Sequence, residues 1–192
     1  MKQNLILGST SPYRKALLES LNVEFKALKP LCDEDALKEA FTGSAKDLCM
    51  FLAKHKAKSL AESTPNSIII GSDQALIFNN EALGKGKTFE GAFKQLSSLS
   101  GNTALLVTAT YLHDSNWGDV FFECNTSLNF KTLSEDDITT YLHLDEPYDC
   151  AGSFKFEKSG QSLFTSVETD DPTAIEGLPL KQLLAELQKK GL

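Results

Sequence analysis

Histidine and cysteine are scarce in this sequence of 192 residues, which contains three of the first and four of the second. The cysteines are widely spaced and form no CxxC pair, so they predict neither a disulfide framework nor a zinc site; they are Cys32, Cys49, Cys124 and Cys150. The sequence also has no HExxH motif and no histidine cluster. Any metal ion that this chain binds must therefore be held mainly by oxygen atoms.

Long apolar runs, repeats and linkers are missing as well. No stretch of about 18 apolar residues marks a membrane-spanning helix, and the first residues lack the apolar core and cleavage site of a signal peptide. We therefore expect a cytoplasmic protein that does not act at a membrane. Because no Pro-, Gly- or Ser-rich linker divides the chain, residues 1–192 are expected to form one domain, long enough to bury about 70% of the unfolded chain's surface.

Positive charge is in deficit over the chain as a whole. The 19 Lys and Arg residues against 26 Asp and Glu residues give a net charge of −7, which is the wrong sign for binding a nucleic-acid polymer or an anionic membrane by bulk electrostatics. The deficit is uneven, because residues 1–58 contain ten basic and seven acidic residues. A small phosphorylated ligand would therefore find its basic partners toward the N-terminus.

Apolar runs, turn residues and helix caps predict a mixed α/β fold. Strands are expected at residues 4–8, 23–28, 67–73, 103–112 and 120–130, with a hairpin after residues 75–78. Helices are expected at residues 12–21, from residue 44 onward, and at residues 88–99, 134–144 and 179–190, and Ser44, Thr88 and Ser134 are the expected caps of three of them. Because strands and helices do not alternate strictly, we expect a mixed sheet flanked by helices.

One candidate site lies where the first strand meets the first helix. Residues 8–15 bring backbone N–H groups, hydroxyls and two cations, Arg14 and Lys15, to a helix N-terminus, an arrangement typical of anion binding. The segment is not a Walker loop, because the GxxxxGK[ST] pattern is absent. The alternative interpretation is a serine cap followed by solvated basic residues.

A second candidate is Asp73, which is expected in a small-residue turn, residues 71–73, where an apolar strand ends, because catalytic groups tend to lie in such loops. Its carboxylate is suited to holding Mg²⁺ or accepting a proton from water, and Lys85 is suited to neutralising a phosphate. The alternative is a turn aspartate with a solvated lysine. The acidic residues 33–35 are likewise either an exposed loop or a site for a hard cation.

A third candidate is the segment 150–157, a small-residue turn leading into an expected strand. Its Glu157 is suited to binding the edge of a nucleotide base. A serine hydrolase is not indicated, because the sequence has no GxSxG motif and no histidine with an orienting carboxylate beyond the neighbours His113 and Asp114.

Taken in order, these segments resemble the Maf family of nucleotide pyrophosphatases. The matching stretches are residues 5–18, 33–34, 56–57, 70–74, 84–85, 99–101, 151–153 and 177–180. The resemblance implies an elongated mixed sheet flanked by helices, with two lobes around a central cleft, as in Maf and ITPase-like proteins. It also implies hydrolysis between the α and β phosphates of a nucleoside triphosphate, with a divalent cation, Mg²⁺ or Mn²⁺, as cofactor.

The same resemblance implies a role for each matching side chain. Asp73 matches the family's proton acceptor, and together with Glu34, which matches the acidic position near the metal, it is an expected metal ligand. The other implied roles are contact with the polyphosphate for Lys56 and Lys85, the phosphate-binding loop for Ser9, Arg14 and Lys15, and base specificity for Tyr13, Gln74 and Glu157.

Base specificity is expected to favour 7-methyl-GTP, because the segments 72–74, 151–155 and 177–180 are most similar to that branch of the family. The branch acting on dTTP and UTP usually has threonine where Gln74 stands. Methylation makes guanine cationic, and an aromatic face such as Tyr13 attracts a cation by about 0.5–2 kcal/mol. Glu157 is suited to accept hydrogen bonds from the base. Three residues depart from the family pattern: Tyr13 replaces a common Trp, Gly86 a usual Pro and Lys15 a common Arg.

Two other functions remain open at this point. One is a dTTP or UTP pyrophosphatase of the same family, and the other is a non-catalytic regulatory protein that binds a nucleotide in the same cleft. Retention of Asp73, Glu34, Lys56 and Lys85 argues against the second. The expected partner is a small-molecule nucleotide, and a homodimer is the assembly we expect if the chain forms one.

Overall fold

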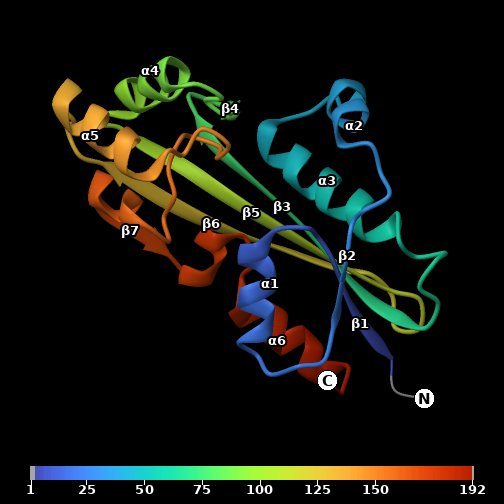
Figure 1. The fold of residues 1–192 in the computed structure, drawn as a ribbon. Helices are drawn as coiled ribbons and strands as arrows, with labels where there is room; N and C mark the ends of the chain where they lie inside the picture. Colours follow the sequence, from blue (N-terminus) through green and yellow to red (C-terminus); the bar gives the residue numbers. More distant parts are fainter. Residues whose placement is uncertain (1–2, 192) are drawn as a thin grey trace. The chain divides into compact units, whose positions relative to one another are not determined.

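The computed structural model describes residues 3–191 and shows two compact units (Figure 1). Unit 1 comprises Met1–Gln74, Thr108–Cys124 and Asp171–Leu192. Unit 2 comprises Ala75–Val107 and Asn125–Asp170. Two units are thus present where the sequence predicts two lobes, and each is formed from segments that are distant in the sequence.

The expected mixed α/β fold is confirmed. Strands pair in the order β2-β1-β3-β5-β6-β7, and β4 pairs with β3. The strand bounds are β1 (Asn4–Gly8), β2 (Lys26–Leu28), β3 (Ser67–Phe78), β4 (Glu81–Leu83), β5 (Thr103–Asp114), β6 (Val120–Phe130) and β7 (Phe164–Thr169). Because β1 runs parallel to β2 and β3 whereas β4 and β7 are antiparallel to their neighbours, the sheet is mixed.

Two of the expected strands differ from the structure. The strand expected at residues 23–28 is limited to β2, and the one expected within residues 150–157 does not form. Gly152 and Ser153 have φ angles of 71° and 58°, which place both in the left-handed region that an extended strand does not contain. The strand that the sequence interpretation missed is β7.

The described residues contain six α-helices and two 3₁₀ turns. They are α1 (Pro12–Glu19), α2 (Glu34–Ala40), α3 (Ala45–Lys58), α4 (Phe89–Leu99), α5 (Glu135–Asp145), α6 (Leu180–Lys189), η1 (Ser159–Leu163) and η2 (Pro172–Glu176). The expected caps of three helices are confirmed, because the side chains of Ser44, Thr88 and Ser134 accept hydrogen bonds from backbone N–H groups in the first turn.

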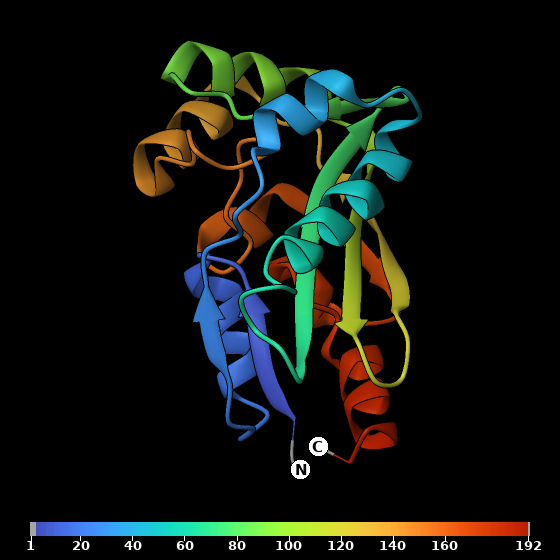
Figure 2. The ribbon, with the colours of Figure 1, turned by 90° about the vertical axis from the view of Figure 1, so that its right-hand side faces the viewer.

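The sheet of unit 1 is covered on both faces by helices (Figures 1 and 2). On one face α1 and α6 pack against β1, β3 and β5, with a core of Leu5, Leu7, Leu18, Ile68, Ile70, Leu112, Leu178, Leu180, Leu183 and Leu187. On the other face α3 lies directly over Gly71 of β3, because a Cβ there would overlap the carbonyl oxygen of Ala53 and lie 2.8 Å from the backbone nitrogen of Ala57. This packing fixes β3, the strand that carries Asp73.

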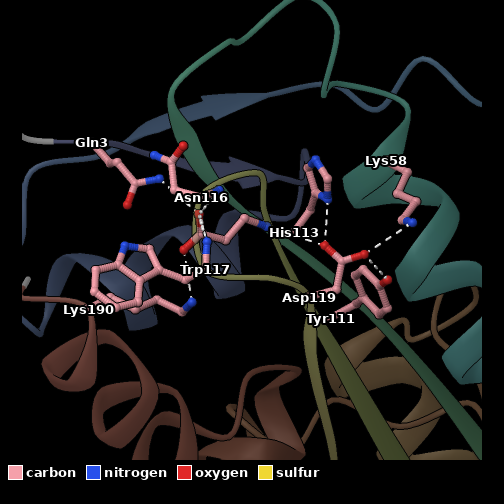
Figure 3. Close-up of polar contacts among 9 residues, drawn as sticks. Gln3, Lys58, Tyr111, His113, Asn116, Trp117, Asp119 and Lys190 are labelled. Atoms are coloured by element: carbon pink, nitrogen blue, oxygen red, sulfur yellow. Dashed lines mark hydrogen bonds and ion pairs between the residues drawn. The ribbon is translucent and has the colours of Figure 1, made fainter.

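Two aspartates connect distant segments of unit 1 near the turn between β5 and β6 (Figure 3). The fully buried Asp114 accepts hydrogen bonds from Lys190 Nζ at 2.8 Å and from Gln3 Nε2 at 2.9 Å. Burial alone would raise the pKa of Asp114, but these hydrogen bonds outweigh it and hold the pKa below its usual value. The second aspartate, Asp119, has the side-chain partners Tyr111, His113 and Lys58.

Candidate active site

Asp73 lies within β3 rather than after its end. The turn expected at residues 71–73 does not form, and the strand continues to Phe78. Gly71 serves the close approach of α3 and not a turn. The expectation that Asp73 occupies a loop is therefore wrong. Its side chain, 16% exposed, is instead presented by a strand that is fixed on both sides.

Lys56 connects Asp73 with Glu34. Its Nζ lies 2.6 Å from Oδ1 of Asp73 and 3.0 Å from Oε2 of Glu34. The lysine side chain is only 8% exposed and comes from α3, whereas the Glu34 side chain is 41% exposed. An ammonium group that is removed from water requires charged partners, and the two carboxylates supply them. The structure thus brings three of the expected site residues into one network.

Glu34 does not lie in an acidic loop, which is a second correction. It begins α2, and the side chain of Asp33 caps this helix by accepting hydrogen bonds from the backbone nitrogens of Asp35 and Ala36. Carboxylates in the first turn of a helix are favoured by the helix dipole, which explains why this run of acidic residues forms a helix. The cap fixes the end of α2 from which Glu34 reaches Lys56.

The strand, loop and helix expected at residues 8–15 are present and line a pocket of about 170 Å³, whose lining residues are Gly8, Ser9, Thr10, Ser11, Arg14, Pro30, Glu34 and Lys56. The buried Ser9 accepts a hydrogen bond from the backbone nitrogen of Ser11, and Ser11 in turn caps α1. Ser11 and Arg14, at the N-terminus of α1, thus share this pocket with Lys56 and Glu34. Backbone N–H groups and cations in such a pocket are suited to a phosphate.

Arg14 is fixed by a residue that is distant in the sequence. Its Nε donates a hydrogen bond to the carbonyl oxygen of Gly177 at 3.0 Å, and Ser72 donates its hydroxyl to the same oxygen at 2.8 Å. Burial lowers the pKa of Arg14, while the nearby Asp73 and Glu34 act against this shift. Arginine nevertheless stays protonated. Gly177 belongs to one of the segments that match the family. Ser72, which shares the Gly177 carbonyl oxygen with Arg14, was not among the site residues expected from the sequence.

Gln74 lies next to Asp73 on β3 and contacts η2. Its Nε2 lies 2.8 Å from the carbonyl oxygen of Ala174, 3.1 Å from that of Ile175 and 2.8 Å from Oγ1 of Thr108. No sequence pattern indicated a role for Thr108, a buried residue of β5. Residues from two distant segments, β5 and η2, thus determine how this side chain is oriented.

Two residues of α1 that belong to the expected site lie outside the pocket lining. Lys15 is 56% exposed and pairs with Glu19 on its own helix at 3.6 Å. Tyr13, on the same helix, is 38% exposed. Of the two expected cations of the phosphate loop, the structure therefore brings Arg14 to the pocket and leaves Lys15 on the helix surface.

Lys85 and Glu157 belong to unit 2. Both are exposed. Burial raises the pKa of the Cys150 thiol above its usual value, and the charge of Glu157 adds to this rise whereas the charge of Lys85 acts against it. Glu157 lies in a turn and not on the expected strand. Lys85 pairs with Ala151 in an isolated β-bridge. The neighbouring Gly86 is tightly enclosed, since a Cβ there would lie 2.6 Å from Oγ of Ser153. The family pattern usually has proline at position 86, which would stiffen the backbone after Lys85. Here close packing around Gly86 restricts the backbone instead.

The carboxylates of Glu34 and Asp73 are the oxygen donors suited to a divalent cation. Residues 3–191 contain no group of three or more His, Cys, Asp and Glu side chains placed to hold a metal ion. Mg²⁺ is commonly bound by one or two carboxylates together with substrate phosphates and water. The pair Glu34 and Asp73 fits this pattern, in which the phosphates of a ligand supply part of the coordination.

The fold and the pocket together define an α/β protein equipped to bind a phosphorylated ligand beside paired carboxylates. The chain belongs to the Maf family, since the family model described as Maf-like protein matches residues 4–190. Among residues 3–191, no helix combines the length and the apolar character needed to cross a membrane.

Curated relatives are similar to this chain over almost its whole length. The 7-methyl-GTP pyrophosphatase of Colwellia psychrerythraea is 40% identical over 191 residues, covering 99% of this chain and 94% of that protein. The protein of the same name from Hydrogenovibrio crunogenus is 41% identical over 186 residues, covering 96% and 92%. Among solved structures, the Staphylococcus aureus Ham1 protein has a TM-score of 0.55 at 16% identity and covers 98% of this chain and 100% of that one. This last likeness concerns the fold alone.

Proposed function

We propose that this chain is a 7-methyl-GTP pyrophosphatase, which hydrolyses the bond between the α and β phosphates to give 7-methyl-GMP and diphosphate. The observation that carries the proposal is the network of Lys56, Asp73 and Glu34 beside the pocket at the N-terminus of α1. Relatives also support the proposal, because three proteins that are about 40% identical to this chain over nearly its full length are each named 7-methyl-GTP pyrophosphatase.

Asp73 is the proposed proton acceptor. Its carboxylate takes a proton from the attacking water, whose oxygen forms the new bond to the α phosphorus while diphosphate leaves. Lys56 holds Oδ1 of Asp73 at 2.6 Å, so the second carboxylate oxygen is the one we assign to the water. A divalent cation, Mg²⁺ or Mn²⁺, held by Glu34 and Asp73, would supply neutralisation of phosphate charge.

The phosphates are proposed to bind at the pocket. The hydroxyl of Ser9 and the guanidinium of Arg14 meet the phosphate oxygens, and Lys56 neutralises charge that grows in the transition state. Lys15 contributes long-range attraction, because its ammonium lies on the helix surface with Glu19. Lys85, in unit 2, is proposed as a further phosphate contact.

Base specificity is proposed to involve Tyr13, Gln74 and Glu157. The aromatic ring of Tyr13, a residue that is 38% exposed, is suited to attract the cationic methylated base. Glu157, a carboxylate in unit 2, is suited to accept from the N1 and 2-amino groups of guanine. A change of Glu157→Gln with Tyr13→Ala is therefore expected to alter the ratio of 7-methyl-GTP to GTP turnover.

The decisive experiment measures diphosphate release from a panel of triphosphates with Mg²⁺ or Mn²⁺. The panel contains 7-methyl-GTP, GTP, ATP, dTTP and UTP, and the Asp73→Asn variant serves as the control for contaminating activity. Preference for 7-methyl-GTP supports the proposal, and preference for dTTP or UTP overturns the assigned substrate. Binding without turnover would identify a regulatory nucleotide-binding protein instead.

Location and assembly complete the proposal. We place the enzyme in the cytoplasm as a single functional domain, in line with four cysteines that form no disulfide among residues 3–191. Fractionation with a reporter fused to the chain tests the location. Light scattering of the purified protein tests whether it forms a homodimer.

A further inference from the structure

We propose that Thr108 and η2 lock Gln74 so that its amide oxygen, which can only accept a hydrogen bond, reads an N–H group of the nucleotide base. Thr108 is then a positioning residue for base specificity. The inference rests on the proposed function, because it assigns Gln74 to the base. It adds that the group that contacts the base is a hydrogen-bond acceptor, and that Thr108 is a side chain that helps to hold it in this orientation.

The orientation of the Gln74 amide follows from its partners. Two of the three atoms that surround Nε2 are backbone carbonyl oxygens, those of Ala174 and Ile175. If the amide were turned over, its oxygen would face these two acceptors and no hydrogen bond to either would form. The carbonyl oxygen of Ile175 would lose its donor, at a cost of about 1–3 kcal/mol, and the amide oxygen would lie against two other oxygens, so the nitrogen points toward η2.

The hydroxyl of Thr108 accepts a hydrogen bond from Gln74 and does not donate one to it. Its hydroxyl donates its single proton to the carbonyl oxygen of Ala174 at 2.8 Å. Its Oγ1 therefore acts as an acceptor toward Nε2 of Gln74, also at 2.8 Å. Thr108 is 1% exposed, so water does not substitute for it. The amide nitrogen is thus committed to the protein, and the amide oxygen is the group available to a ligand.

An acceptor at this position favours bases that present an N–H donor to it. Guanine and 7-methylguanine carry N–H donors at N1 and at the 2-amino group, whereas adenine has an acceptor at N1. A locked acceptor rejects a base that presents a lone pair, because both groups lose their hydrogen bonds with water and gain none. A freely rotating amide would offer its NH₂ group to such a base and lose this discrimination.

Arg14, which is proposed to bind phosphate, contacts the segment around η2 at Gly177, and not at the residues that hold Gln74. Arg14 and Ser72 donate to the carbonyl oxygen of Gly177, one residue beyond η2. Thr108 contacts Ala174 and Gln74 but is not part of this second set. A change at Thr108 is therefore expected to alter the choice of base while leaving the contribution of the phosphates unchanged.

The chain offers a matched control for the test. Thr110 lies on the same strand and the same face as Thr108 and is fully buried. Its Oγ1 has no hydrogen-bond partner among the described residues. Thr110→Val therefore removes a buried hydroxyl of the same kind without removing a hydrogen bond, whereas Thr108→Val removes two.

The experiment compares kcat/KM for 7-methyl-GTP with kcat/KM for ATP in wild type, Thr108→Val, Thr108→Ser and Thr110→Val. We expect Thr108→Val to lower the ratio by about three- to tenfold, as befits the loss of one positioned hydrogen bond. Thr108→Ser is expected to restore the ratio, and Thr110→Val to keep it. An equal ratio in Thr108→Val and Thr110→Val would overturn the inference.

Calorimetric titration with 7-methyl-GMP and AMP, which cannot be hydrolysed in this way, supplies a readout that is independent of turnover. If wild type hydrolyses no triphosphate, the proposed function fails, and the ratio of the two dissociation constants still tests Thr108. Absence of binding by both monophosphates would overturn the assignment of Gln74 to the base.

Discussion

The pairing of Lys56 with Asp73 leads to a quantitative prediction. At the observed 2.6 Å and an effective dielectric constant of about 20, the gross attraction between unit charges is about 6 kcal/mol. The side chains are 8% and 16% exposed, so the loss of hydration cancels much of this gain. We expect a coupling free energy of about 1.5–3 kcal/mol in a double-mutant cycle.

The cycle uses Lys56→Met, Asp73→Asn and the double variant, with the free energy of unfolding measured by urea denaturation. Lys56→Met alone is expected to be the most destabilising change, because it leaves Asp73 and Glu34 without their shared cation. The double variant should recover stability relative to it. A coupling below about 0.5 kcal/mol, the size usual for exposed pairs, would refute the view that this network is desolvated and fixed.

The remaining predictions concern stability and thiol reactivity. The pKa of Asp114 is lowered in the folded state. Its contribution to stability is therefore complete above the unfolded-state pKa of about 3.9 and is lost as the pH falls further. The acid unfolding curves of wild type and Lys190→Met should consequently converge at low pH. Burial raises the pKa of the Cys49 thiol to about 12, so mass spectrometry should find it unmodified by iodoacetamide at pH 8 until the protein is denatured. Gly71→Ala should destabilise the protein by about 1–3 kcal/mol or more in urea denaturation, whereas Gly84→Ala, where a Cβ would meet no atom within 4 Å, should change stability by less than about 1 kcal/mol.

The features that the sequence predicted well depend on neighbouring residues. Ser44 and Ser134 were predicted as caps because the hydrogen bonds of a cap span only a few residues. The hairpin after β3 was predicted for a similar reason, since Asn79 and Asn80 both adopt positive φ angles at its turn. Local chemistry was sufficient for each of these features.

The features that the sequence predicted poorly depend on distant partners. Gly71 was taken as part of a turn, but its need for glycine comes from α3, and a single sequence carries no signal of which helix will pack there. Glu157 was placed on a strand because its surroundings alternate, but Gly152 and Ser153 adopt left-handed conformations. The site residues were identified through family motifs, whereas their positions required the tertiary structure.

The segment around η2 shows how tertiary structure joins two functions that are separate in the sequence. Gly177 fixes Arg14, which is proposed to meet phosphate, and Ala174 fixes Gln74, which is proposed to meet the base. Neither acceptor is a side chain, so the backbone path of this segment matters more than most of its residue types. The exception is Gly177, whose φ of 104° is strained for any residue with a Cβ. A requirement for glycine at this position, next to an arginine more than 160 residues away in the sequence, follows from the geometry of the site.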